Sequence, residues 1–179
     1  TVYYNPNLTT RTAGDIEDIV RQTIYDYDDA HLQVFGGVFR ASKLPGLIVR
    51  SEPSIQNTNM TANIRRFISL RYNPSAHYIL NFINPIHAKP GGGTVTSTGF
   101  YIAGSDEIHY LRCDGLGRLE LYRLGANSQR IVVNREIGTI DYGAGYVDIR
   151  NLHITALADV DFEFQITPLS YDVVSALEQ

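Results

Sequence analysis

Apolar and polar residues alternate along the second half of the chain, from Thr96 to Pro168. The runs YVDIR at 146–150 and DFEFQI at 161–166 show the alternation most clearly. Side chains on a β-strand point to opposite faces with a period of two, so each run has one apolar and one polar face. Segments 114–117, 125–128 and 142–145 separate such runs and are rich in Gly, Asn and Asp, which tolerate a positive φ. We therefore predict a ladder of short antiparallel strands, either sandwich-like or a partly open barrel.

The first third of the chain has helical periodicity instead. One apolar stripe is formed by Ile16, Ile19, Val20, Ile24 and Tyr27. Thr12, followed three residues later by Asp15, resembles a capping box. These features predict a helix over about 13–26, which ends before the acidic group at 26–29 because those charges would oppose the helix dipole. Tyr25 lies on the polar side of this helix and is a candidate contact residue.

The remainder of the first half predicts short strands. Segment 32–44 fits either a strand with a bulge or a short helix, whereas Pro45-Gly46 predicts a turn and LIVR at 47–50 a short strand. Segment 77–83, HYILNFI, predicts a strand that is buried on both faces. The Pro- and Gly-rich segment 84–93 is the best candidate boundary. We expect an α+β, β-rich fold, with an α+β region at 1–90 that holds the amphipathic helix and an antiparallel β region at 91–179.

Composition narrows the possible functions. The 179 residues carry 15 Lys and Arg against 19 Asp and Glu, a formal net charge of −4, whereas nucleic-acid backbones require clustered basic residues. There is no run of about 18 apolar residues, so we expect no membrane-spanning helix. Cys113 is the one cysteine, which excludes an internal disulfide and a cysteine-based zinc site. The chain does not begin with Met, which indicates a fragment or a processed product. Twelve Tyr and no Trp favour contact surfaces.

Motifs for nucleotide binding and nucleophilic catalysis are incomplete. The segment Lys89–Thr94 has a lysine and three glycines, but the lysine precedes the glycines and a strand follows them. A phosphate loop needs the reverse order and a helix N-terminus. Ser105 leads into a predicted strand, whereas a nucleophilic serine needs a strand-to-helix elbow. Cys113 has no predicted helix N-terminus to lower its pKa, so we expect an inert thiol.

Histidines and carboxylates do not form a recognisable constellation either. The histidines are His31, His77, His87, His109 and His153. His109 and His153 lie on strands that could be neighbours, but no third zinc ligand is evident. The carboxylates weighed for glycoside hydrolysis are Asp106, Glu107, Asp159, Asp161 and Glu163. They lie beside turns or on polar strand faces, so a catalytic pair across a cleft is not predicted. We therefore predict no catalytic, cofactor-binding or metal-binding residues and no small-molecule substrate.

Several segments, taken in order, resemble the C-terminal part of the baseplate wedge protein of T-even-like contractile-tailed bacteriophages. The similar segments are TTRTAGDIEDIVRQTIYDYDDAHLQVFGGVFRASKL (9–44), SEPSIQNTNMTANIRR (51–66), TGFYIAGSDEIHYLRCDGLGRLELYRL (98–124), GTIDYGAGYVDIRNLHIT (138–155) and ITPLSYDVV (166–174). The chain departs from the family pattern at 175–179, SALEQ.

The resemblance implies a virion structural protein of the phage tail, assembled in the cytoplasm of the bacterial host. It implies no catalysis, a homo-oligomer, and contacts with other wedge proteins in the ring around the tail hub, without nucleic acid, membrane or cofactor. Two other classes stay open from the residues alone. One is a carbohydrate-binding module of a phage tail, which requires a concave platform of aromatic side chains. The other is a hydrolase that uses Asp106, Asp159 or Asp161.

Overall fold

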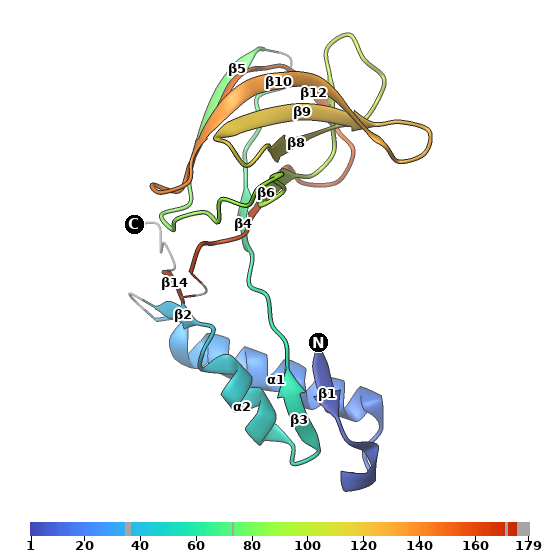
Figure 1. The fold of residues 1–179 in the computed structure, drawn as a ribbon, viewed down its shortest axis with the longest axis vertical. Helices are drawn as coiled ribbons and strands as arrows, with labels where there is room; N and C mark the ends of the chain where they lie inside the picture. The colour runs from blue at the N-terminus through green and yellow to red at the C-terminus, as the bar shows by residue number, and fades with distance from the viewer. Residues whose placement is uncertain (35–36, 73, 171, 175–179) are drawn as a thin grey trace. The chain divides into compact units, whose positions relative to one another are not determined.

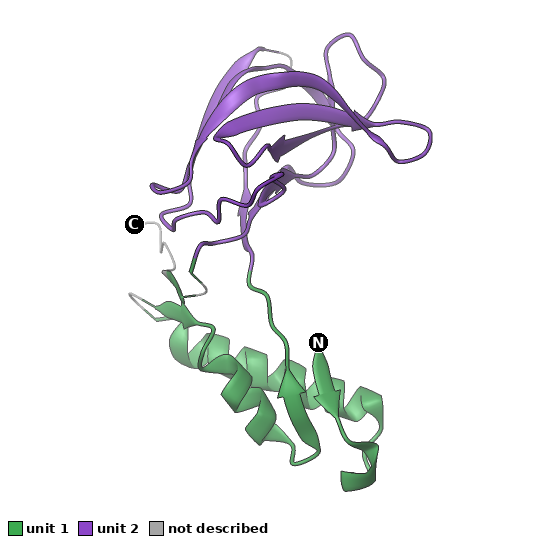
Figure 2. Cartoon of the chain, in the orientation of Figure 1, with its two compact units in different colours: residues 1–62, 170–179 green, residues 63–169 purple. Residues whose placement is uncertain are grey.

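The computed structural model describes residues 1–34, 37–72, 74–170 and 172–174, and these form two compact units (Figure 2). Unit 1 comprises residues 1–62 and 170–179, and unit 2 comprises residues 63–169. These limits differ from the expected regions 1–90 and 91–179. The reason is strand pairing: β4 (Ile64–Phe67) and β5 (Ala76–Asn81) belong to the sheet of unit 2. In unit 1, β14 (Asp172–Val174) pairs with β2 (Val38–Arg40). The departing segment 175–179 lies outside the described residues.

Unit 1 is built on two helices. Its other elements are β1 (Val2–Tyr4), the 3₁₀ turn η1 (Pro6–Leu8), α1 (Ala13–His31), α2 (Leu44–Ser51) and β3 (Ile55–Thr58). β1 and β3 form an antiparallel pair, as do β2 and β14. The core of the unit consists of Ile16, Tyr27, Leu44, Ile48 and Ile55, which are all buried. Segment 32–44, which had two possible readings, contains β2, while residues 35–36 within it lie outside the described residues.

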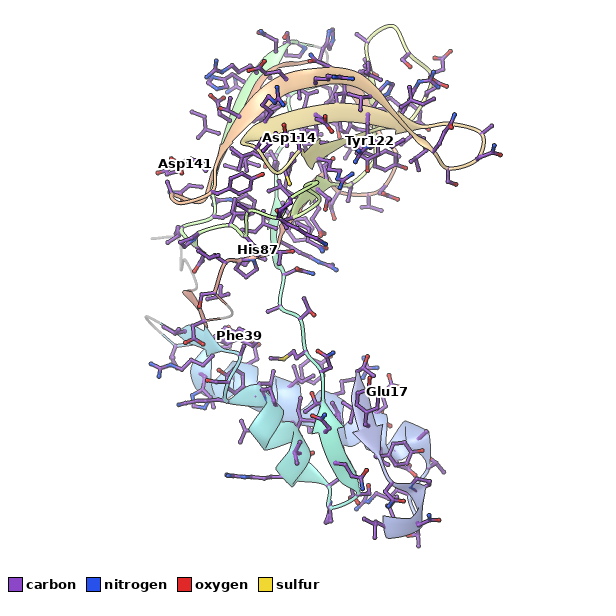
Figure 3. The ribbon with its side chains drawn as sticks, in the orientation of Figure 1. Glu17, Phe39, His87, Asp114, Tyr122 and Asp141 are labelled. Carbon is purple, nitrogen blue, oxygen red and sulfur yellow. The ribbon has the colours of Figure 1, made fainter. Side chains whose placement is uncertain are left out.

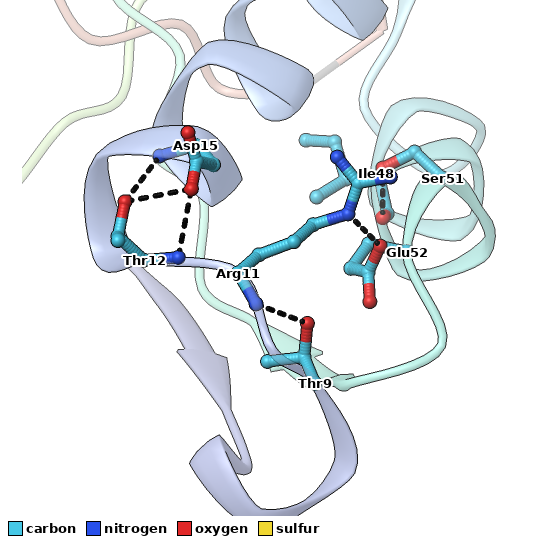
Figure 4. Close-up of polar contacts among 7 residues, drawn as sticks. All are labelled: Thr9, Arg11, Thr12, Asp15, Ile48, Ser51 and Glu52. Carbon is cyan, nitrogen blue, oxygen red and sulfur yellow. Dashed lines mark hydrogen bonds and ion pairs between the residues drawn. The ribbon is translucent and has the colours of Figure 1, made fainter.

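Helix α1 begins where the sequence predicts. The Thr12 hydroxyl accepts a hydrogen bond from the Asp15 N–H at 3.2 Å (Figure 4), and an Asp15 carboxylate oxygen accepts one from the Thr12 N–H at 2.8 Å. The predicted end near residue 26 was wrong, because Tyr27 is a buried core residue whose hydroxyl accepts a hydrogen bond from the Arg40 N–H at 2.9 Å. Burial in the next turn outweighs the modest dipole term. None of the described helices is long and apolar enough to span a membrane.

The predicted strand at 47–50 was also wrong, because this segment belongs to α2. Leu44 and Ile48 are both buried, and their spacing of four places them on one helical face. Pro45 lies in the first turn of the helix, where its fixed φ and missing N–H are tolerated. The Pro-Gly pair therefore starts a helix here instead of forming a turn.

Unit 2 is one curled, antiparallel half-barrel (Figure 1). Within the described residues the sheet runs β4-β13-β6-β8-β9-β10-β11-β5, and β12 and β7 pair beside it, with β7 also on β8. The further strands are β6 (Val95–Ser97), β7 (Phe100–Ile102), β8 (His109–Cys113), β9 (Arg118–Leu124), β10 (Arg130–Asp141), β11 (Tyr146–Leu152), β12 (Ile154–Leu157) and β13 (Glu163–Ile166). This confirms the α+β, β-rich prediction and, of its two forms, favours the partly open barrel.

The alternation that predicted the strand ladder is confirmed in β11 and β13. Phe164 and Ile166 are fully buried while the residues between them are half-buried, and β11 alternates similarly from Tyr146 to Ile149. Edge-to-face contacts join Phe162 to Phe100 at 5.3 Å and to Phe164 at 5.4 Å between ring centroids. The predicted turns hold positive-φ residues, namely Gly115, Gly117, Ser128 and Gly145.

Strand β5 is not buried on both faces, so that prediction was wrong. It lies at one end of the sheet, paired only with β11 on the described path. Leu80 is buried, but Ile79 is 64% exposed. The largely apolar segment 77–83 thus reflects an edge strand with one uncovered face, which local sequence does not distinguish from a central strand.

The capping box of α1 provides a stability test. Thr12→Ala removes the acceptor for the Asp15 N–H, and we expect the free energy of unfolding to fall by about 1 kcal/mol. The matched control is Thr10→Ala, which changes an exposed threonine outside the cap. Urea unfolding followed by far-ultraviolet circular dichroism measures both variants. Equal destabilisation by the two substitutions would show that the cap contributes nothing.

Candidate interaction surfaces

The carboxylates considered for hydrolysis lie in two segments, 106–107 and 159–163. Four of them are exposed: Asp106, Glu107, Asp159 and Asp161. Glu107 is ion-paired to Arg123 at 2.5 Å, and Glu163 to Arg65 at 3.2 Å. Among the described residues no group of three or more His, Cys, Asp or Glu could hold a metal ion. Glycoside hydrolysis requires two carboxyl groups that face each other across a cleft, whereas Glu107 and Glu163 are each held by an arginine.

The histidines make local contacts. His77 Nε2 lies 2.5 Å from an Asp148 carboxylate oxygen. His109 is buried, with Nδ1 2.7 Å from the Glu107 carbonyl oxygen. In unit 1, the ring centroid of His31 lies 4.8 Å from that of Tyr27. The His77 contact joins β5 to β11, and within the described part of the chain these histidines belong to no group that could hold a metal ion.

The glycine-rich segment 89–94 is a structural clamp. Gly92 has a φ of +69°, and a Cβ there would lie 1.9 Å from the Cys113 carbonyl oxygen. The Gly93 N–H donates to that carbonyl oxygen at 3.2 Å and approaches Cys113 Sγ at 3.1 Å. The Gly92 N–H donates to the Lys89 carbonyl oxygen at 2.9 Å, so one of these two backbone donors closes the loop and the other contacts β8.

Cys113 is an internal hydrogen-bond acceptor. It is fully buried, and its Sγ also accepts from the Val95 N–H at 3.3 Å and lies 3.4 Å from the Thr94 hydroxyl. Burial raises the pKa of the thiol, but the hydrogen bonds from Thr94 and Val95 outweigh it, so the pKa lies below its ordinary value. From the sequence, only a helix N-terminus was considered as a cause of a lowered pKa. These donors carry no local signal, because they depend on segment 93–95 folding against β8. The thiol is still shielded from solvent, which fits a packing role.

The clamp can be tested with two neighbouring glycines. Gly91 and Gly92 both have positive φ, but a Cβ on Gly91 meets nothing within 4 Å. We expect Gly91→Ala to lower the free energy of unfolding by about 1–2 kcal/mol through backbone strain alone. Gly92→Ala adds a backbone clash and should cost about 3 kcal/mol or more. Chemical denaturation of unit 2, followed by tyrosine fluorescence, measures the difference, and a Gly92→Ala variant as stable as Gly91→Ala would contradict the clamp.

Asp114 fixes the adjacent turn between β8 and β9 (Figure 3). Its carboxylate accepts hydrogen bonds from the Leu116 N–H at 2.7 Å and from Arg118 Nε at 2.8 Å. Desolvation raises the pKa of this carboxyl, but the hydrogen bonds from Arg118 and Leu116 lower the pKa by more than desolvation raises it. The pKa therefore lies below its usual value. A carboxyl with a depressed pKa in the folded state stabilises the fold above its unfolded-state pKa, and this contribution is lost as the pH falls.

Asp114 therefore predicts a pH-dependent part of the stability. Between about pH 6 and about pH 3 the wild-type chain should lose more unfolding free energy than Asp114→Asn, whose side chain does not titrate in this range. Asp159→Asn, at an exposed position, is the control and should retain the wild-type pH dependence. Urea midpoints at the two pH values give the comparison. Identical slopes for wild type and Asp114→Asn would refute the assignment.

Exposed apolar side chains mark possible contact areas in unit 1. Tyr25, the contact residue that the sequence suggested, is 56% exposed, and the adjacent Ile24 is exposed as well. Ile24 was expected in the core stripe, but Val20 and Thr23 occupy the half-buried side of α1 instead. On the same unit a hollow of about 350 Å³ lies between α1 and α2, with Leu47 on its rim. Asp26, His31 and Arg50 also line this hollow, whereas Ile24 and Tyr25 lie outside it.

Within the described residues, the sheet of unit 2 ends in β4 and β5, and each of these strands has one edge without a partner strand. β4 exposes Phe67 to 65%, and β5 exposes Ile79. A groove of about 550 Å³ runs along β5 and is lined by residues 68–69, 71 and 74–80. No signal in the sequence pointed to this groove, because it depends on which strands end the sheet.

The carbohydrate-binding reading finds little geometric support. Among the described residues, the nearest feature to an aromatic platform is the stacked pair Tyr110 and Tyr122, with ring centroids 5.5 Å apart. Both are half-buried, and neither lines the groove along β5 or the hollow between α1 and α2. A sugar platform needs an aromatic ring at a concave, polar-rimmed surface.

Comparison with known proteins shows that the first part of the chain is similar to structural proteins of the phage tail baseplate. The family described as baseplate structural protein gp6, C-terminal domain III, matches residues 1–66, which confirms the resemblance to the baseplate wedge protein of contractile-tailed phages. The matched segment holds the helices and the β1–β3 pair of unit 1 and ends within β4. No curated protein matches the chain.

Proposed function

We propose that this chain is a structural component of the phage tail baseplate that acts by self-association and by contacts with other wedge proteins in the ring of wedges. The observation that carries the proposal is the match of residues 1–66 to a baseplate structural family. The chain would act within the virion tail after assembly in the host cytoplasm, without catalysing a reaction. Its partners would be proteins, and neither nucleic acid nor membrane enters the proposal.

The surface chemistry supports this proposal. Tyr25 and Ile24 on α1 place an aromatic and an aliphatic side chain at one exposed site of the family-matched unit. Aromatic residues are enriched in protein interfaces, where the ring packs and the hydroxyl stays hydrated. Asp18 and Gln22 on the same helix are exposed and would form a polar rim.

Self-association can be measured directly. We expect light scattering of the purified chain to give a mass that rises with concentration to a dimer or a larger oligomer, whose contact buries about 1,000 Å² or more in total. Ile24→Glu places a charge in the apolar area and should weaken assembly at least about tenfold. Leu8→Glu is the matched control, since Leu8 is an exposed leucine of the same unit outside α1.

Co-sedimentation with full-length wedge proteins tests the second half of the proposal. A complex that forms with the wild-type chain supports a place in the ring of wedges. A chain that stays monomeric at high concentration and that binds no wedge protein would overturn the proposed function.

A further inference from the structure

The outer edge of β5 presents unpaired backbone groups. Phe82, just after β5, donates its N–H to the Gly145 carbonyl oxygen at 2.9 Å, so its backbone faces β11. Backbone direction alternates along a strand, and therefore His77, Ile79 and Asn81 direct their N–H and C=O groups away from β11. The Arg66 guanidinium of β4 donates to the Asn81 carbonyl, which confirms this direction. No strand among the described residues pairs with this edge.

The edge borders a groove of about 550 Å³. It is lined by β5 and by residues 68–69, 71 and 74–75. The Arg71 N–H donates to the Tyr78 hydroxyl at 3.2 Å, so this segment is held beside β5. At the end near Asn81 the Arg66 contact occupies the edge, while the backbone groups of His77 and Ile79 stay available.

Apart from the register shift near Ala76 in its pairing with β11, this edge carries few of the features that protect edge strands against strand addition. Natural edge strands carry lysine, proline, bulges or inward charges that prevent pairing with another chain. β5 has the sequence AHYILN, without Lys, Arg or Pro. Its outward backbone groups surround the 64% exposed Ile79. An unprotected apolar edge on a stable sheet is typical of a strand-addition site.

The charge of the groove selects the kind of strand. Arg71 lines it, whereas none of its described lining residues is Asp or Glu. The His77 imidazole lies at the same edge, paired with Asp148. Charge complementarity therefore favours a ligand with carboxylates, and an extended segment places alternate side chains on one face.

We propose that an extended, acidic segment of a partner protein adds to the free edge of β5 as a further strand. Its backbone pairs with His77 and Ile79, an apolar side chain of the segment packs on Ile79, and a carboxylate lies near Arg71. All neighbouring strands on the main path pair antiparallel, so the eight strands leave β4 and β5 running in opposite directions. A single added strand can thus be antiparallel to only one of them, and the groove assigns it to β5. The inference rests on the proposed function insofar as the chain works through protein contacts.

The test uses the full chain and two synthetic peptides of six residues, one alternating glutamate with valine and one alternating lysine with valine. Amide chemical shifts of the isotope-labelled protein report binding. We expect the acidic peptide to shift the amides of His77 and Ile79 and to bind at least about tenfold more tightly than the basic peptide. A version of the acidic peptide that is N-methylated on alternate residues should lose binding, because its donors are blocked.

Two variants with a matched control locate the site. Ile79→Pro removes an outward N–H that the ladder does not use, a position where edge strands tolerate proline, and it should weaken binding at least about tenfold. Arg71→Glu should reverse the preference in favour of the basic peptide. The control is Leu116→Ala, at a residue of the same unit that is 80% exposed. Alanine is used there because a proline would disturb the turn. A dispersed amide spectrum verifies folding.

Several results would overturn the proposal. One is the absence of any amide shift at millimolar acidic peptide, and another is equal binding of the two peptides. The third is unaltered binding of the N-methylated peptide. The N-methylation test uses the wild-type chain, so it remains valid even if Ile79→Pro does not fold. Self-association of the chain that depends on Ile79, without peptide binding, would assign the edge to a second copy instead. If wedge proteins bind Ile79→Pro as they bind wild type while the peptide fails, this inference falls and the proposed function stands.

Discussion

The bend in β10 is the constraint on which the shape of unit 2 depends. This strand of 12 residues pairs with both β9 and β11, and its register against β9 shifts between Val132 and Asn134 and again before Gly138. Such bulges bend a strand and increase its twist. Gly138 lets β11 approach closely, because a Cβ at this position would lie 2.1 Å from the Asp148 carbonyl oxygen. The bend curls the sheet around the buried phenylalanines, yet the strand order leaves β4 and β5 at its ends without a common ladder. Side chains therefore fill the core, while no backbone hydrogen-bond ladder joins β4 to β5 among the described residues.

The sequence predicted those parts of the fold that follow from local rules. Alternation in β11 and β13, the turns at positive-φ residues and the capping box at Thr12 depend on neighbours within a few residues, so each was visible in the pattern. The end of α1, the helical state of 44–51 and the exposed face of β5 were not. Tyr27 extends α1 because it packs against β2, and β5 is half exposed because it ends the sheet. Both features depend on residues that are distant in sequence, and the local pattern of apolar and polar residues does not reveal such partners.

The candidate site shows the same division. The residue types predict no recognisable catalytic constellation, and this stays a prediction; the structure places Asp106, Asp159 and Asp161 at exposed positions. The donors that surround Cys113 and the groove along β5 could not be predicted. The first requires the loop 93–95 to fold against β8, and the second requires knowledge of which strands lack a neighbour. Interaction surfaces are made by topology, whereas catalytic motifs often leave a signature in short segments.

Unit 1 is discontinuous in sequence, and this limits how the chain can connect the strands of the half-barrel. Unit 2 is inserted between residues 62 and 170, and β14 returns to pair with β2. Both ends of the inserted sheet segment are therefore tied to unit 1 by chain connections, next to β4 on one side and after β13 on the other. Closing the barrel by direct pairing of β4 with β5 would satisfy the backbone groups of both strands. However, residues 68–69, 71 and 74–75 of the connection line the groove along β5, and Arg66 reaches a carbonyl of β5 only at Asn81. The unpaired edge is thus a consequence of how this chain connects its strands, and an assembly protein can keep such an edge only if a partner covers it or its surroundings discourage uncontrolled pairing.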